Sequence, residues 1–171
     1  FPTSDHIYSS AALDEDANGN TSAILFGSAD GSFYSVGPDG KLLWKYDTGD
    51  PIRSSPAVGF APDGKSRIVY FGDGNGKLYA LNAADGSLRW AFDTTSKETE
   101  LADRNDLNGS VALGKTGIYV GGEHGQLWYL PYDYCLNAKD DRCSDISSLP
   151  QTFSGLYYVS PGGNTSADFP E

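Results

Sequence analysis

Apolar and aromatic residues occur along this chain in short alternating runs, and turns containing Asp, Asn and Gly separate one run from the next. Alternation with a period of two is typical of half-buried β-strands, and closely spaced turn residues favour hairpins. The pattern therefore predicts an all-β fold without long helices. The predicted strands are 9–13, 23–27, 32–36, 41–46, 54–58, 67–72, 77–81, 87–92, 110–113, 117–121, 126–130 and 156–160.

The chain also repeats itself. The segment ILFGSADGSFYSV realigns with VYFGDGNGKLYAL and again with IYVGGEHGQLWYL, anchored on Gly27, Gly72 and Gly121. These glycines lie 45 and 49 residues apart, and Trp44 lies 46 residues before Trp90. A period of ~40 to 50 residues with four strands per unit is typical of β-propeller blades.

The units predict three four-stranded antiparallel blades at about 6–50, 51–95 and 108–160, within a domain of residues 1–160 that is followed by a tail or linker at 161–171. Closed propellers generally have four to eight blades, so three form an open arc or part of a larger ring. We expect the remaining blades to come from a longer parent chain, from another copy or from another protein. A generic antiparallel sandwich is the alternative fold.

The second unit carries a specific motif, with Ala80, Gly86 and Trp90 at the first, seventh and eleventh positions of ALNAADGSLRW. This motif resembles the quinoprotein-type (PQQ-like) β-propeller repeat, and the first unit keeps its Gly40 and Trp44. In that family the tryptophan packs between neighbouring blades against a glycine-containing peptide. The resemblance therefore implies that Trp44, Trp90, Gly40 and Gly86 dock one blade on the next.

Charge limits the class of partner. Twelve Lys and Arg residues against 23 Asp and Glu residues give a formal net charge of -11. A negative surface repels phosphate backbones and anionic lipids, and no apolar run approaches the ~20 residues that a membrane-spanning helix needs. We expect no nucleic-acid partner and no membrane insertion.

The two cysteines, Cys135 and Cys143, lie close together in a polar stretch. Their spacing does not fit a redox Cys-x-x-Cys pair or a four-ligand zinc site. A disulfide closing this loop is the favoured interpretation, with two unpaired surface thiols as the alternative. The disulfide predicts an extracytoplasmic location, namely the periplasm, the cell surface or the medium.

One loop is a candidate metal site. The segment DEDANGN places Asp14, Asp16, Asn18 and Asn20 at alternate positions, and Gly19 allows a sharp turn. Alternating oxygen ligands suit calcium, and the loop is similar to the calcium loops of FG-GAP propellers. The alternative is an ordinary acidic hairpin turn.

No catalytic residues are predicted. Quinoprotein dehydrogenases carry a disulfide between adjacent cysteines over PQQ, whereas Cys135 and Cys143 are not adjacent. No Ser, His and Asp group has the context of a nucleophile elbow. The prediction is a non-catalytic binding scaffold or sensor for protein or peptide partners. The alternatives are a fragment of a PQQ-dependent dehydrogenase and a calcium-dependent adhesion module. The charged insert 96–106 is either a recognition loop or a solvated linker.

Overall fold

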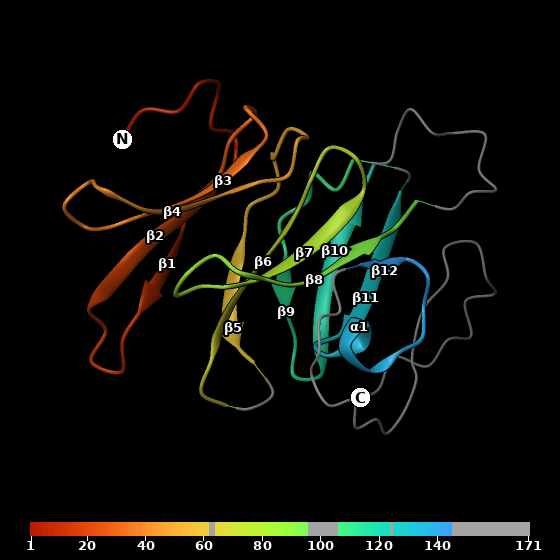
Figure 1. Ribbon diagram of the computed structural model, residues 1–171. Coiled ribbons are helices and arrows are strands. Elements are labelled where there is room, and N and C mark those ends of the chain that lie inside the picture. Colours follow the sequence, from red (N-terminus) through yellow and green to blue (C-terminus); the bar gives the residue numbers. More distant parts are fainter. Residues whose placement is uncertain (62–63, 96–105, 124, 145–171) are drawn as a thin grey trace.

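Three antiparallel sheets lie side by side in the computed structural model, which describes residues 1–61, 64–95, 106–123 and 125–144 (Figure 1). Each sheet is built on a meander of three or four consecutive strands joined by hairpins. The strands of the first two sheets are β1 (Ala12–Glu15), β2 (Thr21–Gly27), β3 (Ser32–Val36), β4 (Leu42–Asp47), β5 (Ala57–Phe60), β6 (Arg67–Gly72), β7 (Lys77–Asn82) and β8 (Leu88–Asp93). The remaining elements are β9 (Ala112–Leu113), β10 (Gly117–Gly122), β11 (Gln126–Pro131), α1 (Tyr134–Asn137) and β12 (Cys143–Ser144).

The first sheet has the order β1-β2-β3-β4, the second β12-β8-β7-β6-β5 and the third β11-β10-β9. Consecutive pairing of this kind is the topology of propeller blades, and we call the sheets blade 1, blade 2 and blade 3. The all-β fold of antiparallel, blade-like sheets predicted from the sequence is confirmed. The hairpin turns use the expected glycines, with φ of 85° at Gly31 and 79° at both Gly40 and Gly76. A left-handed backbone is accessible to glycine at little cost.

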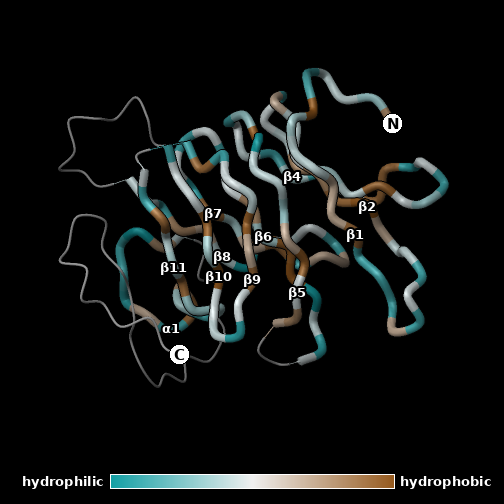
Figure 2. Tube along the Cα trace, turned by 180° about the vertical axis from the view of Figure 1, so that it is seen from behind, coloured by the Kyte–Doolittle hydropathy of each residue, from teal (hydrophilic) through white to brown (hydrophobic). Residues whose placement is uncertain are grey.

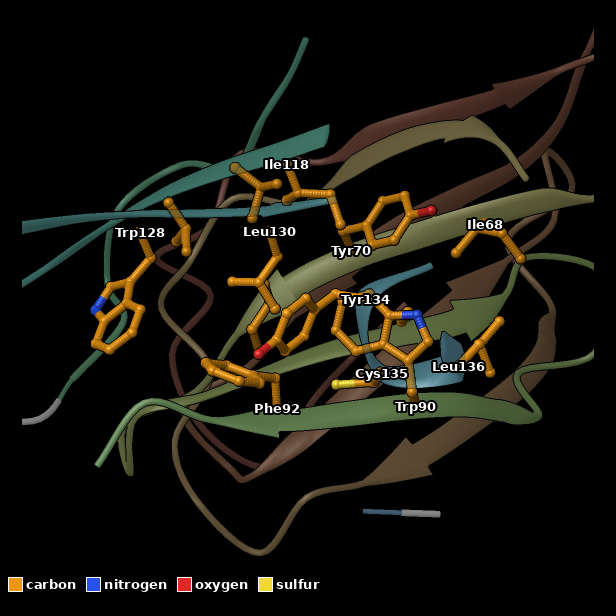
Figure 3. Packing of buried hydrophobic residues seen from close by; sticks show 14 of the residues in the cluster. Ile68, Tyr70, Trp90, Phe92, Ile118, Trp128, Leu130, Tyr134, Cys135 and Leu136 are labelled. Carbon is orange, nitrogen blue, oxygen red and sulfur yellow. The ribbon is translucent and has the colours of Figure 1, made fainter. Parts of the chain in front are cut away.

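The cores lie between the blades. In each strand, alternate side chains point to opposite faces, so each blade contributes one apolar face to each neighbour. Phe33 of blade 1 stacks on Phe71 of blade 2, with ring centroids 4.0 Å apart. Between blades 2 and 3, Trp90, Phe92 and Trp128 belong to one buried cluster (Figure 3). Figure 2 shows the apolar positions along the strands and the hydrophilic positions in the turns.

The blades differ from the predicted set of three four-stranded sheets, because they contain four, five and three strands within the described residues. The fifth strand of blade 2 is β12, which comes from the cysteine loop and pairs with β8 through Cys143 and Phe92. The predicted strand 156–160 and the insert 96–105 lie outside the described residues. The prediction missed β12 because the chain after blade 3 turns back onto the neighbouring blade.

The first strand of each blade begins later than predicted. These strands, β1, β5 and β9, begin at residues 12, 57 and 112. The residues before them do not pair as strands. Those before β1 contact blade 1 itself, and those before β5 and β9 also contact the preceding blade. We call these segments connectors; they are residues 5–10, 50–55 and 106–111.

Candidate interaction surface

Each connector between blades inserts one aliphatic side chain over a glycine of the preceding blade. Ile52 is fully buried, and a Cβ at Gly27 would overlap its side chain. The Ile52 amide also donates to the carbonyl of Ser28 at 3.0 Å. Gly27 therefore forms a slot that admits Ile52 because it has no side chain of its own.

The next joint repeats this arrangement. Leu107 is 1% exposed, a Cβ at Gly72 would overlap it, and its amide donates to the carbonyl of Asp73 at 2.9 Å. The Asp73 carboxylate is buried, and it accepts hydrogen bonds from the Lys77 amide (2.9 Å) and the Tyr79 hydroxyl (2.9 Å). Burial raises the pKa of Asp73 above its usual value, although these hydrogen bonds act to lower it.

Hydrogen bonds also join successive connectors. The Ser10 amide donates to Ser55 Oγ at 2.9 Å, and the Val111 amide donates to the Ser55 carbonyl at 3.0 Å. Ser54 Oγ donates to the Gly109 carbonyl at 2.7 Å. The three connectors therefore form one continuous backbone surface across all three blades.

Polar and aromatic side chains follow this surface in a continuous series of contacts, which we call the polar row. His6 Nδ1 lies 2.6 Å from Asp5 Oδ1, and the His6 ring stacks on Tyr8 at 5.6 Å. The Arg53 guanidinium lies over the Tyr8 ring at 5.9 Å. The members of the polar row are Asp5, His6, Tyr8, Arg53, Asp106, Asn108 and Glu123.

The second half of the polar row continues onto blade 3. Arg53 Nη1 lies 3.4 Å from Asp106 Oδ2, and Asn108 Nδ2 donates to the same oxygen at 3.2 Å. Asn108 also donates to Glu123 Oε1 at 2.7 Å. Side chains from all three blades thus hold one another in place while parts of each stay exposed.

Solvent reaches much of the polar row. Tyr8 is 60% exposed, and the side chains of His6 and Arg53 are 75% and 42% exposed.

Hydrogen bonds from the amide and ring of His6 lower the pKa of Asp5. A shallow hollow of about 330 Å³ is lined by Thr3, Ser4, Asp5 and His6 at the blade 1 end. The polar row offers flat aromatic groups, one guanidinium and several carboxylates to a partner.

The predicted docking tryptophans occupy two different settings. The Trp44 indole lies on Gly86 of blade 2, where a Cβ would come within 2.5 Å of the ring. Its Nε1 donates to the Ala83 carbonyl at 2.9 Å. The equivalent turn glycine of blade 1, Gly40, has nothing among the described residues within 4 Å of a Cβ placed on it.

Trp90 lies between blades 2 and 3 and is fully buried. In blade 3, helix α1 follows the third strand, β11. In blades 1 and 2, the glycine turn takes the corresponding place after the third strand. Figure 3 shows Trp90 beside Cys135 and Leu136 of this helix. The Trp90 Nε1 has no hydrogen-bond partner among the described residues. The indole is therefore held here by apolar packing.

The cysteine loop fastens blade 3 to blade 2. Cys135 and Cys143 form a disulfide, so the alternative of two unpaired thiols is wrong. Cys135 is fully buried, and the Asp93 amide of blade 2 donates to the Arg142 carbonyl at 2.9 Å. We call residues 132–144 the clasp.

A compact ion pair stabilises the clasp. Arg142 donates to Asp140 from Nε (3.0 Å) and Nη2 (2.7 Å), and the Tyr134 hydroxyl donates to Asp140 Oδ2 at 2.8 Å. Hydrogen bonding to Arg142 holds the pKa of Asp140 well below its usual value. Burial raises the pKa of Tyr134 to about 12.

The candidate calcium loop forms the turn between β1 and β2. Asp16 accepts hydrogen bonds from the Asn20 side chain (3.0 Å) and from the amides of Asn20 (2.9 Å) and Asn18 (2.8 Å), and these hydrogen bonds lower its pKa. Asp14 points elsewhere, because its Oδ1 lies 2.9 Å from Arg67 Nε of blade 2. Calcium binding here stays a prediction.

Within the described residues, no three His, Cys, Asp or Glu side chains gather as a metal-binding group. The same residues include no helix that is long and apolar enough to cross a membrane.

Reasoning from the sequence missed the connectors and the polar row. A signal was present, because 45 residues separate both Gly27 from Gly72 and Ile7 from Ile52. Because each isoleucine also precedes the glycine of its own blade by 20 residues, this spacing would have identified the first two connectors as part of the repeat, whereas Leu107 precedes Gly121 by only 14 residues.

Comparisons with known proteins agree with this geometry. A family model described as "Outer membrane protein assembly factor BamB" matches residues 11–152. Among solved structures, "The crystal structure of BamB from Moraxella catarrhalis" is similar in fold, with a TM-score of 0.52 and 20% sequence identity. The match covers 66% of this chain and 35% of that one, so the chain spans about a third of that structure. No curated protein matches the chain.

Proposed function

Because the chain belongs to the family of the outer membrane protein assembly factor BamB, we propose that it is a non-catalytic β-propeller scaffold that binds protein or peptide partners outside the cytoplasm. Loops held by a rigid sheet scaffold commonly carry recognition. The disulfide between Cys135 and Cys143 supports an oxidising compartment. The quinoprotein dehydrogenase and calcium-dependent adhesion hypotheses stay predictions.

The polar row is the observation that carries this proposal. Its side chains come from three blades and are fixed by mutual contacts, so binding a partner costs little side-chain entropy. Tyr and Arg are enriched among the residues that dominate binding energy in protein interfaces, and Tyr8 packs with Arg53 at the centre of the polar row.

Charge indicates the kind of partner segment. Asp5, Asp106 and Glu123 place three carboxylates along the polar row, on a chain whose net charge is -11. Complementary potential favours a partner segment with basic side chains, which gives an association rate that falls with ionic strength.

Site-specific photo-crosslinking tests this function. A benzoylphenylalanine at position 8 should form a discrete adduct in cells of the source organism, whereas the same group at position 60 should not. Phe60 is 58% exposed, close to the 60% of Tyr8, and lies on β5 outside the polar row. The adduct should disappear when Glu123→Gln and Asp106→Asn are combined. Equal adducts at both positions, or none at position 8, would contradict an interaction surface at the polar row.

A further inference from the structure

An asparagine directly before a glycine is a reactive pair, and the chain contains three of them. The glycine amide nitrogen attacks the asparagine side-chain carbonyl carbon, because glycine has no side chain to hinder the approach. A carbon–nitrogen bond forms, the amide proton passes to a base in the solvent, and the side-chain nitrogen leaves as ammonia. Water then opens the cyclic imide to aspartate or isoaspartate. The pairs are Asn18-Gly19, Asn75-Gly76 and Asn108-Gly109.

The folded structure determines which pair can react. The side-chain carbonyl and the following amide must turn toward each other, so the backbone of the pair has to move. A pair in a stable part of the fold reacts only when that part opens, whereas exposed turns open at a small cost in free energy. The surroundings of the three pairs therefore predict different rates.

Asn108 is held at both reacting groups. Its Nδ2 donates to Asp106 Oδ2 at 3.2 Å and to Glu123 Oε1 at 2.7 Å. The next residue, Gly109, is closely packed, because a Cβ placed on it would lie 2.8 Å from the Gly121 carbonyl oxygen. The pair can rearrange only when the polar row and this connector open together.

The pair at 75–76 is fixed through its backbone. The Asn75 amide donates to the buried Asp73 carboxylate at 2.9 Å. Gly76 is buried, and its carbonyl accepts hydrogen bonds from the Thr94 amide (2.9 Å) and hydroxyl (2.6 Å). The Asn75 side chain is exposed, but turning the Gly76 nitrogen toward it would break the bonds that join this turn to the residue after β8.

The pair at 18–19 lies at the tip of the hairpin between β1 and β2, where residues 15–20 are all exposed (Figure 1). A Cβ placed on Gly19 has nothing among the described residues within 4 Å of it. The Gly19 amide donates to the Asp16 carbonyl at 3.0 Å. That hydrogen bond lies within the turn, so it can open without disturbing a blade.

We propose that Asn18 is a site of spontaneous deamidation in the folded protein, whereas Asn75 and Asn108 are protected. The reaction needs only water as a co-reactant. Its product adds a carboxylate to a turn that already contains Asp16, and the isoaspartate form lengthens the backbone of that turn by one carbon. The turn lies at the opposite end of β1 from the connector, so the modification leaves the polar row intact.

Peptide mapping by mass spectrometry, after incubation of the full 171-residue chain at mildly alkaline pH, is the test. Aspartate and isoaspartate should accumulate at position 18 at least ~10-fold faster than at positions 75 and 108, because the protected pairs must first break several hydrogen bonds. In denaturant the three pairs should react at comparable rates. Asn18→Gln should remove most of the modification of the folded chain, whereas the control Asn75→Gln should leave it unchanged.

A variant of the polar row tests the protection of Asn108. Combining Asp106→Ala with Glu123→Ala removes both acceptors of the Asn108 side chain, so position 108 should react faster while positions 18 and 75 keep their rates. Equal rates at all three positions of the folded wild-type chain would overturn the proposal. So would a position 18 that reacts only in denaturant, or a position 108 whose rate the double variant leaves unchanged.

Discussion

Single glycines decide whether a tryptophan can dock. Gly86 and Gly40 occupy equivalent turns with φ of 71° and 79°, but only Gly86 lies under an indole. Alanine is strained at either position by ~1 to 2 kcal/mol because of the left-handed backbone. At Gly86 the methyl group would also overlap the Trp44 ring.

Gly86→Ala should therefore lower the free energy of unfolding by about 1 to 3 kcal/mol more than Gly40→Ala, which is the usual cost of overpacking. Urea unfolding of the two variants measures the difference. Equal losses would mean that the contact between Trp44 and Gly86 does not stabilise the joint.

The Asp140 carboxylate gives the clasp a dependence on pH. Because its folded-state pKa is lowered from 3.8, its contribution is present above the unfolded value and is lost as pH falls toward the folded value. Asp140→Asn should cost about 1.5 to 3 kcal/mol near neutral pH, the range for hydrogen bonds to charged groups. The difference from wild type should shrink below pH 3.8, as urea unfolding at several pH values would reveal. A gap that does not change with pH would argue against an ionised Asp140 in the clasp.

Among the elements, the clasp is an added strand that depends on a covalent link. β12 contains only Cys143 and Ser144, and pairing of this length is weak without support. Replacing both cysteines with serine should cost about 2 to 4 kcal/mol, as expected for a short disulfide loop. It should also speed amide exchange at Asp93, which donates to the Arg142 carbonyl.

The Asp73 amide is the internal control, because it donates to the Lys77 carbonyl inside blade 2 and away from the clasp. Its exchange should change little in the double serine variant. Uniform acceleration at Asp93 and Asp73 would indicate global destabilisation and would contradict a local role for the disulfide.

Strands with strong alternation and glycine turns were predictable from sequence, because their pairing partners lie next to them in the chain. β12 was not, since a two-residue strand carries no periodic pattern and its partner β8 lies some 50 residues earlier. The polar row was missed for a related reason. Its contacts, such as Arg53 with Asp106, join separate blades, and no local motif marks them.

At the scale of the whole molecule, an ion pair between blades 1 and 2 competes with the predicted calcium site for Asp14. Asp14, one of the four predicted calcium ligands, is engaged by Arg67 of blade 2 at 2.9 Å. Millimolar calcium tests the predicted site through the thermal unfolding midpoint of the chain, which stays unchanged as long as Asp14 remains paired with Arg67. A ligand that binds only the folded state raises that midpoint, so a clear increase would show that Asp14 exchanges Arg67 for the ion.

The blades stack through an aliphatic side chain seated on a glycine of the preceding blade. Nuclear Overhauser effects between methyl groups and glycine α-protons test it directly. We expect contacts of Ile52 with Gly27 and of Leu107 with Gly72. Absence of both contacts, with cross-peaks that instead pair the sheets as a two-layer sandwich, would contradict it.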